Sequence, residues 1–198
     1  MQFLPTKKEK FVSALRNYIH KNILRRGVTA NRLRILRKIY LFDLCCSHPF
    51  YQNTDALILC RDILTECSVE LIKKGIFMTV DLWGDGIKSI DIKAFTALLG
   101  ETVAHTATAK EKSISLCLTE KEIRITSKGE KLRGYPLRLI KKLGGRYFVL
   151  ENTNAISIPA LTVKCDKITE IDDIKTRLAD PLSPIKVYLS VIENKYFV

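Results

Sequence analysis

Residues 91–106 read Asp91-Ile-Lys-Ala-Phe-Thr-Ala-Leu-Leu-Gly-Glu-Thr-Val-Ala-His-Thr106, and this stretch decides the fold. It predicts a helix, and it stands within an order of helix, strand, helix, two strands, helix and two strands between about Leu57 and Ala160. The strands expected after it alternate apolar and polar residues and form two hairpins. They cover Ser113–Leu118 with Lys121–Ser127, and Arg146–Glu151 with Ala155–Val163. This pattern indicates an α+β domain, a sandwich of helices on a sheet.

The composition is that of a globular protein with a buried core. The chain has 198 residues, of which 46% are hydrophobic, and no apolar run approaches the roughly 18 residues that a membrane span needs. The first residues, Met1-Gln-Phe-Leu-Pro-Thr-Lys7, lack the long apolar centre of a signal peptide. The six cysteines contain no C-x-x-C pair, so we expect free thiols in a reducing compartment and no metal site. The sequence therefore predicts a cytoplasmic protein.

The positive charge is concentrated near the start of the chain. The net charge is +12, and residues 1–50 contain eleven Lys and Arg against only Glu9 and Asp43, a net of +9. A basic segment joined to a nearly neutral domain suggests that the basic part meets an acidic protein, a nucleic acid or an anionic membrane surface.

Residues 1–50 predict a basic helical hairpin. Residues 7–26 carry one apolar stripe, Gly27 ends the first helix, and Thr29 caps a second helix that runs to about Cys46. The hairpin cannot bury its apolar stripe alone, so it needs either the following domain or a second copy of itself. We expect three parts: residues 1–50 for dimerisation and docking, residues 51–163 for the sandwich, and residues 164–198 as an extension of unclear role.

Three smaller expectations concern the connections. Ser47–Asn53 reads as a connector, and Thr54 reads as the cap of a helix that continues to about Lys74. In the extension, Thr169–Leu178 is compatible with a short helix, and Ile185–Ile192 is strongly strand-like.

The order of elements resembles the ATP-binding domain of two-component sensor histidine kinases. In that family one helix carries the motif N-L-L-x-N-A-x-K-H-T, and Leu98-Leu-Gly-Glu-Thr-Val-Ala-His-Thr106 is similar to it. Leu98, Leu99, His105 and Thr106 match the motif. The position of the magnesium-binding asparagine holds Glu101, whose carboxylate is compatible with Mg²⁺ but cannot reproduce the hydrogen bonding of an amide.

The family's adenine-reading motif, D-x-G-x-G, corresponds to Ser127-Lys-Gly-Glu-Lys131. Gly129 is kept, Ser127 replaces the aspartate, and Lys131 replaces the second glycine. The glycine-rich loop that closes over the phosphates has no counterpart in Glu130–Pro136. Leu139–Gly145 followed by Tyr147–Leu150 does resemble the family's closing helix, glycine pair and strand. The resemblance covers about half of the chain and implies a degenerate nucleotide site at Glu101, His105, Ser127 and Gly129.

The resemblance also implies a role for the hairpin, because the kinases place a dimerising hairpin with a phosphorylated histidine before this domain. His20 is the histidine of the hairpin helices. As phosphoacceptor it would be the nucleophile, with Arg16 and Lys21 stabilising the phosphoryl group.

Three functions follow. The first is a histidine phosphotransferase, or an inactive kinase-like adaptor, that dimerises and docks a response regulator without a cofactor. The second is an ATP-dependent kinase with drifted motifs, which would need ATP and Mg²⁺. The third is a nucleic-acid-binding protein. We expect the first, with an antiparallel helical hairpin followed by a two-layer α/β sandwich.

Overall fold

The computed structural model describes residues 29–161 and 184–192, together with positions 10, 14, 15, 17, 18, 21, 22 and 25. Most of the helix predicted over residues 7–26 and all of the helix predicted over Thr169–Leu178 therefore lie outside the described residues. The same holds for Arg16 and His20, so their predicted roles are not placed by the fold.

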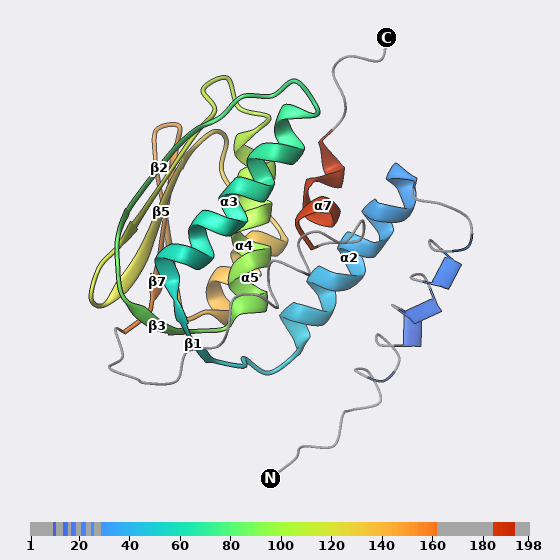
Figure 1. Cartoon of the computed structure of the whole chain (residues 1–198), viewed down its shortest axis with the longest axis horizontal. Helices are drawn as coiled ribbons and strands as arrows, with labels where there is room; N and C mark the ends of the chain where they lie inside the picture. Colours follow the sequence, from blue (N-terminus) through green and yellow to red (C-terminus); the bar gives the residue numbers. More distant parts are fainter. Residues whose placement is uncertain are drawn as a thin grey trace.

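A five-stranded sheet forms one layer of the structure (Figure 1). Its order is β2 (Thr79–Gly84), β4 (Ser113–Leu118), β5 (Glu122–Lys128), β7 (Thr153–Pro159) and β6 (Arg146–Leu150). The β2 and β4 strands are parallel, and the other three pairs are antiparallel. The two predicted hairpins, β4–β5 and β6–β7, are both confirmed.

The strands form because their side chains alternate between a buried and an open face. Ile114, Leu116 and Leu118 of β4 are buried, and so are Ile123 and Ile125 of β5, while the intervening residues remain accessible. A strand with this period of two can bury only one face. The helices consequently cover one side of the sheet.

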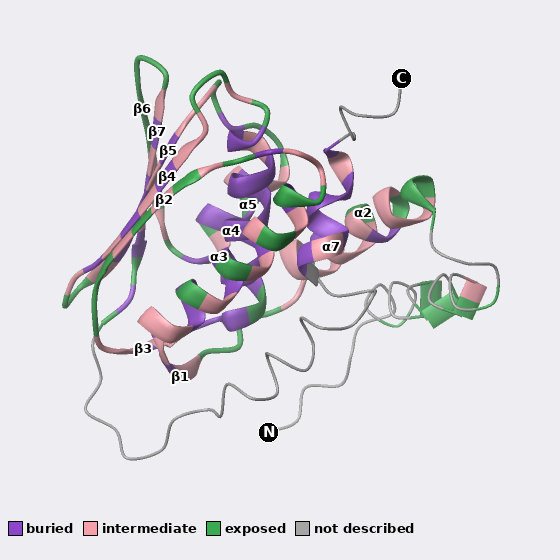
Figure 2. Cartoon of the chain, turned by 45° about the horizontal axis from the view of Figure 1, so that its top comes forward, coloured by how far each residue is buried: buried purple, intermediate pink, exposed green. Residues whose placement is uncertain are grey.

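Three helices supply that covering layer: α3 (Ala56–Ile72), α4 (Ile92–Thr106) and α5 (Tyr135–Lys142). Figure 2 shows the buried residues gathered on the helices where they meet the sheet and each other. The predicted helix 91–106 is confirmed as α4, with Asp91 as its N-cap. Phe95, Leu98 and Leu99 are fully buried, so α4 is the central helix of the core.

The start of α3 differs from the sequence-based expectation. Asp55, rather than Thr54, caps the helix by accepting a hydrogen bond from the Ile58 backbone N–H at 3.0 Å. The residues before it form β1 (Gln52–Asp55), which pairs antiparallel with β3 (Ile87–Ile90). The end of the predicted connector is therefore a strand, because its backbone finds a partner about 35 positions away in the sequence.

The helix predicted after Thr29 is confirmed as α2 (Ala30–Cys46). Thr29 Oγ1 accepts from the Arg32 backbone N–H at 3.4 Å. The helix packs against α4, α5 and α7, and Leu36 and Leu41 are fully buried there. Within the described residues, the apolar stripe of α2 is thus covered by the same chain.

A lysine fixes the end of α2 to the helical layer. Nζ of Lys142 donates to the carbonyl oxygens of Leu44 and Ser47, the second at 2.9 Å. The same nitrogen lies 3.9 Å from Oδ2 of Asp91. One buried cation therefore joins the last turn of α2, the first turn of α4 and the end of α5.

The prediction of a strand over Ile185–Ile192 is wrong. The segment forms the short helix α7 (Pro184–Tyr188) and the 3₁₀ turn η1 (Leu189–Val191), which pack among α2, α3 and α4. Its residues are nearly all apolar, so alternation alone could not decide between strand and helix. Ile185, Tyr188, Leu189 and Ile192 are buried and recur at i, i+3, i+4 and i+7, which is the helical signal that sequence reasoning missed.

In the part of the chain that the structure describes, no helix is long and apolar enough to cross a membrane.

Candidate functional site

The candidate site lies on α4 and at the end of β5, where the sequence placed four residues of a nucleotide site. The N-terminus of α4 is fixed by Asp91, which accepts from the Ala94 N–H at 3.0 Å and from the Phe50 N–H at 3.2 Å. This cap sets the start of the helix, and Glu101 and His105 follow on its third and fourth turns, four positions apart. Residues with that spacing lie on the same side of a helix.

Glu101 is held by an ion pair with α2. Nε of Arg37 donates to Oε1 of Glu101 at 2.6 Å, and Nη2 of Arg37 donates to Oε2. Glu101 is only 4% exposed. Burial raises the pKa of Glu101, and the Arg37 guanidinium opposes that rise. The two oxygens that could have bound a cation already accept from a cation of the protein itself.

The neighbouring residue on α4 is covered by the C-terminal segment. Gly100 faces the ring of Tyr188, and a Cβ added at Gly100 would lie 2.9 Å from Cδ2 of that ring. Tyr188 is 2% exposed, and burial, together with the nearby Glu101 charge, raises the pKa of its hydroxyl. Glycine at position 100 therefore permits a close approach that any larger residue would prevent.

The other three predicted positions meet near the end of β5. Gly129 has a φ of +130°, and a Cβ built there would lie 3.4 Å from Cε1 of His105. Ser127 is 2% exposed. Among the described residues, neither Ser127 Oγ nor the buried His105 Nδ1 has a hydrogen-bond partner. Burial lowers the pKa of His105, against the opposing charge of Glu130, and thereby favours the neutral imidazole.

The loop after Gly129 is tied down by residues that sequence reasoning missed. Asn154 is fully buried, and its Nδ2 donates to the Glu130 carbonyl at 2.9 Å. The Tyr147 hydroxyl donates to Asn154 Oδ1 at 2.6 Å and accepts from the Leu132 N–H at 2.8 Å. An asparagine placed diagonally to a tyrosine across the β6–β7 hairpin could have signalled this network. In the kinase resemblance this region corresponds to a flexible phosphate lid, whereas here its first residues are fixed.

Three of the residues that the sequence pointed to already have a role within the fold or offer a different polar group. Glu101 is neutralised by Arg37, Tyr188 packs on Gly100, and Ser127 offers a hydroxyl in place of a carboxylate. Among the described residues, no group of three or more His, Cys, Asp or Glu could hold a metal ion. The structure therefore places His105 beside Gly129 and pairs Glu101 with Arg37.

The hairpin residues of the predicted phosphotransfer site are only partly described. Lys21 is exposed on a helical segment, while Arg16 and His20 lie outside the described residues. Their grouping around a phosphoryl group remains a prediction from the sequence.

No family model and no curated protein matches this chain. Solved structures do match it. The histidine kinase ShkA, in its full-length complex with AMPPNP, is 14% identical with a TM-score of 0.51; the match covers 83% of this chain and 41% of that one. The histidine kinase AdeS of Acinetobacter baumannii is 11% identical with a TM-score of 0.48, over 82% of this chain and 100% of that one. A histidine kinase of Burkholderia phymatum STM815 is 10% identical with a TM-score of 0.45, over 80% and 100%. The likeness to ShkA shows that this chain has a histidine kinase-type fold.

Proposed function

We propose that this protein is a kinase-like component of two-component signalling that works without ATP and docks a response regulator. The observation that carries the proposal is the ion pair between Arg37 and Glu101. Glu101 stands where the resemblance places a magnesium-binding residue, and Arg37 neutralises its carboxylate. Arg37 belongs to α2, which packs against α4. A domain whose own side chains occupy the nucleotide-facing position is better suited to the binding of a partner protein than to nucleotide turnover.

Within this proposal, His20 would be the phosphoacceptor of a phosphotransferase. His20 would attack the phosphorus of an aspartyl phosphate on the regulator, so that a P–N bond forms while the P–O bond breaks and the aspartate carboxylate leaves. Arg16 and Lys21 would neutralise the charge on the transferred group. Without this step, the same protein would act as an adaptor that binds the regulator and sequesters it, and it would function as a homodimer in either case.

Nucleotide binding is the first test, because it separates the proposal from an ATP-dependent kinase. A ligand present at about 100 times its Kd stabilises a folded protein by roughly 2.7 kcal/mol. We expect millimolar ATP or ADP with Mg²⁺ to leave the free energy of unfolding unchanged within about 0.5 kcal/mol. An active histidine kinase catalytic domain measured in parallel is the positive control. A clear nucleotide-dependent stabilisation would refute the ATP-independent proposal.

Phosphotransfer is the second test. We expect label to pass from a phosphorylated response regulator to the wild-type protein, and no label to arrive from γ-labelled ATP. A His20→Ala variant should lose the transfer. A His48→Ala variant, which removes a histidine from the connector, should keep it. If the His20 variant accepts label as well as wild type, the phosphotransferase activity is excluded and the adaptor remains.

A further inference from the structure

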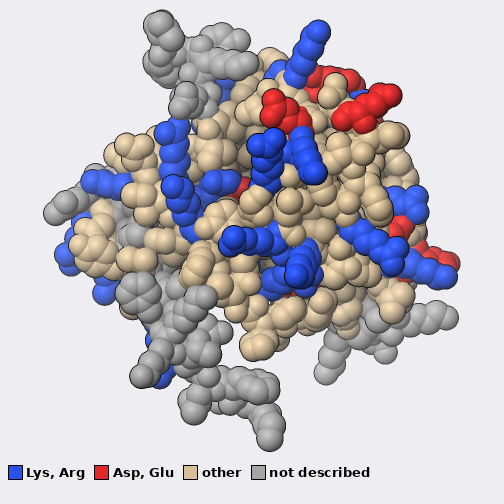
Figure 3. Space-filling view, turned by 180° about the vertical axis from the view of Figure 1, so that it is seen from behind, with Lys and Arg blue, Asp and Glu red and all other residues tan. Residues whose placement is uncertain are grey.

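A basic surface lies on α5 and on the loop that leads into it. From Lys131 to Leu150 the sequence contains no Asp or Glu. Five cations of this stretch are exposed. Four of them lie on α5 or on the loop before it, and we call them the α5 basic patch: Lys131, Arg133, Arg138 and Lys141. Figure 3 views the molecule from behind and shows Lys and Arg side chains gathered across the middle of that face, with the Asp and Glu side chains mostly toward its margins.

The charges of the α5 basic patch are not paired with carboxylates of the described residues, although Arg138 lies over the Tyr135 ring. None of the four residues forms a salt bridge with a described residue, whereas the neighbouring cations do have internal tasks. The side chain of Lys142 is buried against the end of α2. The hydrogen bond from Ser157 lowers the pKa of the Glu122 carboxyl, and the charge of Arg146 adds a smaller effect in the same direction. A cluster of like charges without anionic partners costs the folded domain self-repulsion.

The patch extends to the end of α2 and includes apolar surface. Helix α5 packs against α2. Burial raises the pKa of the Cys45 thiol near the end of α2, and the charge of Arg138 opposes that rise. The guanidinium carbon of Arg138 lies 5.8 Å from the centroid of the Tyr135 ring. Tyr135 and Leu137 are both half-buried. The surface therefore combines cations with aromatic and aliphatic area.

Helix α2 belongs to the segment that the sequence assigned to docking, but several of its arginines already interact within the protein. Arg37 faces inward and pairs with Glu101, and Arg32 and Arg34 also have interaction partners. Among the described residues, α5 and the loop before it therefore present more cations without ion-pair partners than α2 does.

We propose that the α5 basic patch is the docking surface for an acidic protein partner. The inference rests on the proposed function, since it names the surface through which the kinase-like protein would meet a regulator. Arginine and tyrosine are enriched in protein–protein interfaces, and a positive patch steers the approach of a negative one.

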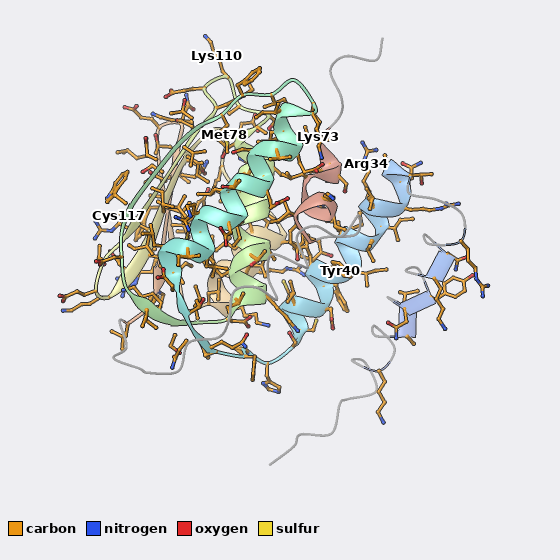
Figure 4. All side chains as sticks on the ribbon, in the orientation of Figure 1. Arg34, Tyr40, Lys73, Met78, Lys110 and Cys117 are labelled. Carbon is orange, nitrogen blue, oxygen red and sulfur yellow. The ribbon has the colours of Figure 1, made fainter. Side chains whose placement is uncertain are left out.

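The test uses the full chain and a fluorescein-labelled glutamate oligomer, with binding followed by fluorescence anisotropy at low salt. Three triple variants each remove three positive charges. The patch variant is Arg133→Gln, Arg138→Gln and Lys141→Gln. The matched control is Arg61→Gln, Lys110→Gln and Lys121→Gln, which are exposed elsewhere; Figure 4 shows Lys110 in a loop remote from α2. The hairpin variant is Lys21→Gln, Arg25→Gln and Lys38→Gln.

We expect the patch variant to raise the Kd for the glutamate oligomer about tenfold, because an exposed ion pair contributes modestly and three are lost. The control should change the Kd less than twofold. The dependence of log Kd on log salt should also become shallower in the patch variant and stay unchanged in the control. Circular dichroism spectra of all three variants would verify that they fold.

Three outcomes would overturn the inference. Equal loss in the patch and control variants would mean that only net charge matters. Loss confined to the hairpin variant would place docking on the N-terminal segment. Tighter binding of random duplex DNA than of the glutamate oligomer, reduced in the patch variant, would make the surface a nucleic-acid site. None of these measurements uses ATP or a phosphorylated regulator, so the inference can fail while the proposed function holds, and the reverse.

Discussion

Replacing Arg37 with methionine tests the ion pair that closes the candidate site. The substitution keeps much of the side-chain volume but leaves the Glu101 carboxylate buried without its cation. Removing one partner of a buried ion pair costs about 3–5 kcal/mol. The side chain of Arg37 is 18% exposed while that of Glu101 is 3% exposed, so water reaches the pair from one side and the lower end applies. We expect a loss of about 3 kcal/mol in the free energy of unfolding.

Urea denaturation at pH 7, followed by far-UV circular dichroism, measures this loss. Lys38→Met, an exposed neighbour on α2, is the control and should change the stability by less than about 0.5 kcal/mol. The double variant Arg37→Met with Glu101→Leu removes both charges and should lie within about 1 kcal/mol of wild type, because a well-packed apolar pair can replace a buried ion pair. A single-variant loss below about 1 kcal/mol would show that the pair is not buried as described.

The free energy of unfolding of the Arg37→Met variant should also depend on pH in a defined direction. In Arg37→Met nothing opposes the rise in the Glu101 pKa that burial causes, so the folded-state pKa exceeds the unfolded one. The folded variant then binds the proton more tightly, and its stability is regained below the unfolded pKa and lost as pH rises through the folded pKa. The stability gap to wild type should therefore narrow on going from pH 7 to pH 4. A gap that stays constant or widens would contradict the assignment of the loss to the Glu101 charge.

Three further substitutions or modifications have definite expected results. Gly100→Ala, although alanine is the better helix former, should lower the free energy of unfolding by about 1–3 kcal/mol because its Cβ meets the Tyr188 ring; a gain of stability in urea denaturation would show that the ring can move aside. Lys142→Met should cost about 2–4 kcal/mol by leaving the carbonyl oxygens at the end of α2 unpaired, and an unchanged urea midpoint would argue against that anchor. Burial raises the pKa of Cys60 to about 12, so iodoacetamide at pH 7 should modify the exposed Cys46 well before Cys60; mass spectrometry showing equal rates would indicate that α3 opens readily.

The sequence predicted the elements whose signal is local. Helix α4 and the strands β4 and β5 follow from the periods of their apolar residues, because each element buries one face against the shared core. Strand β1 was not predicted because it is short and contains no alternating apolar residues. Its partner β3 lies beyond α3 and β2 in the chain. A strand of this kind is defined by pairing rather than by composition.

The candidate site was predicted in its positions but not in its chemistry. Glu101, His105, Ser127 and Gly129 were found because a motif spacing is readable along the chain. The ion pair to Arg37 joins residues 64 positions apart, and the Tyr188 contact joins α4 to a segment that the sequence indicated as a strand. Which side chain satisfies a buried carboxylate depends on the packing of whole helices, and no periodicity contains that information.

The contact between Tyr188 and α4 also constrains when the protein can complete its folding during synthesis. Residues 184–192 fill the space among α2, α3 and α4, and Leu36 of α2 shares a buried cluster with Val187. During translation, a nascent chain whose emerged part stops before residue 184 leaves this apolar surface of α2 and α4 open to water. Domains generally fold as units during synthesis, and exposed apolar surface in an unfinished chain favours aggregation. The packing of α2 and α4 against residues 184–192 can therefore be completed only after this segment has been synthesised.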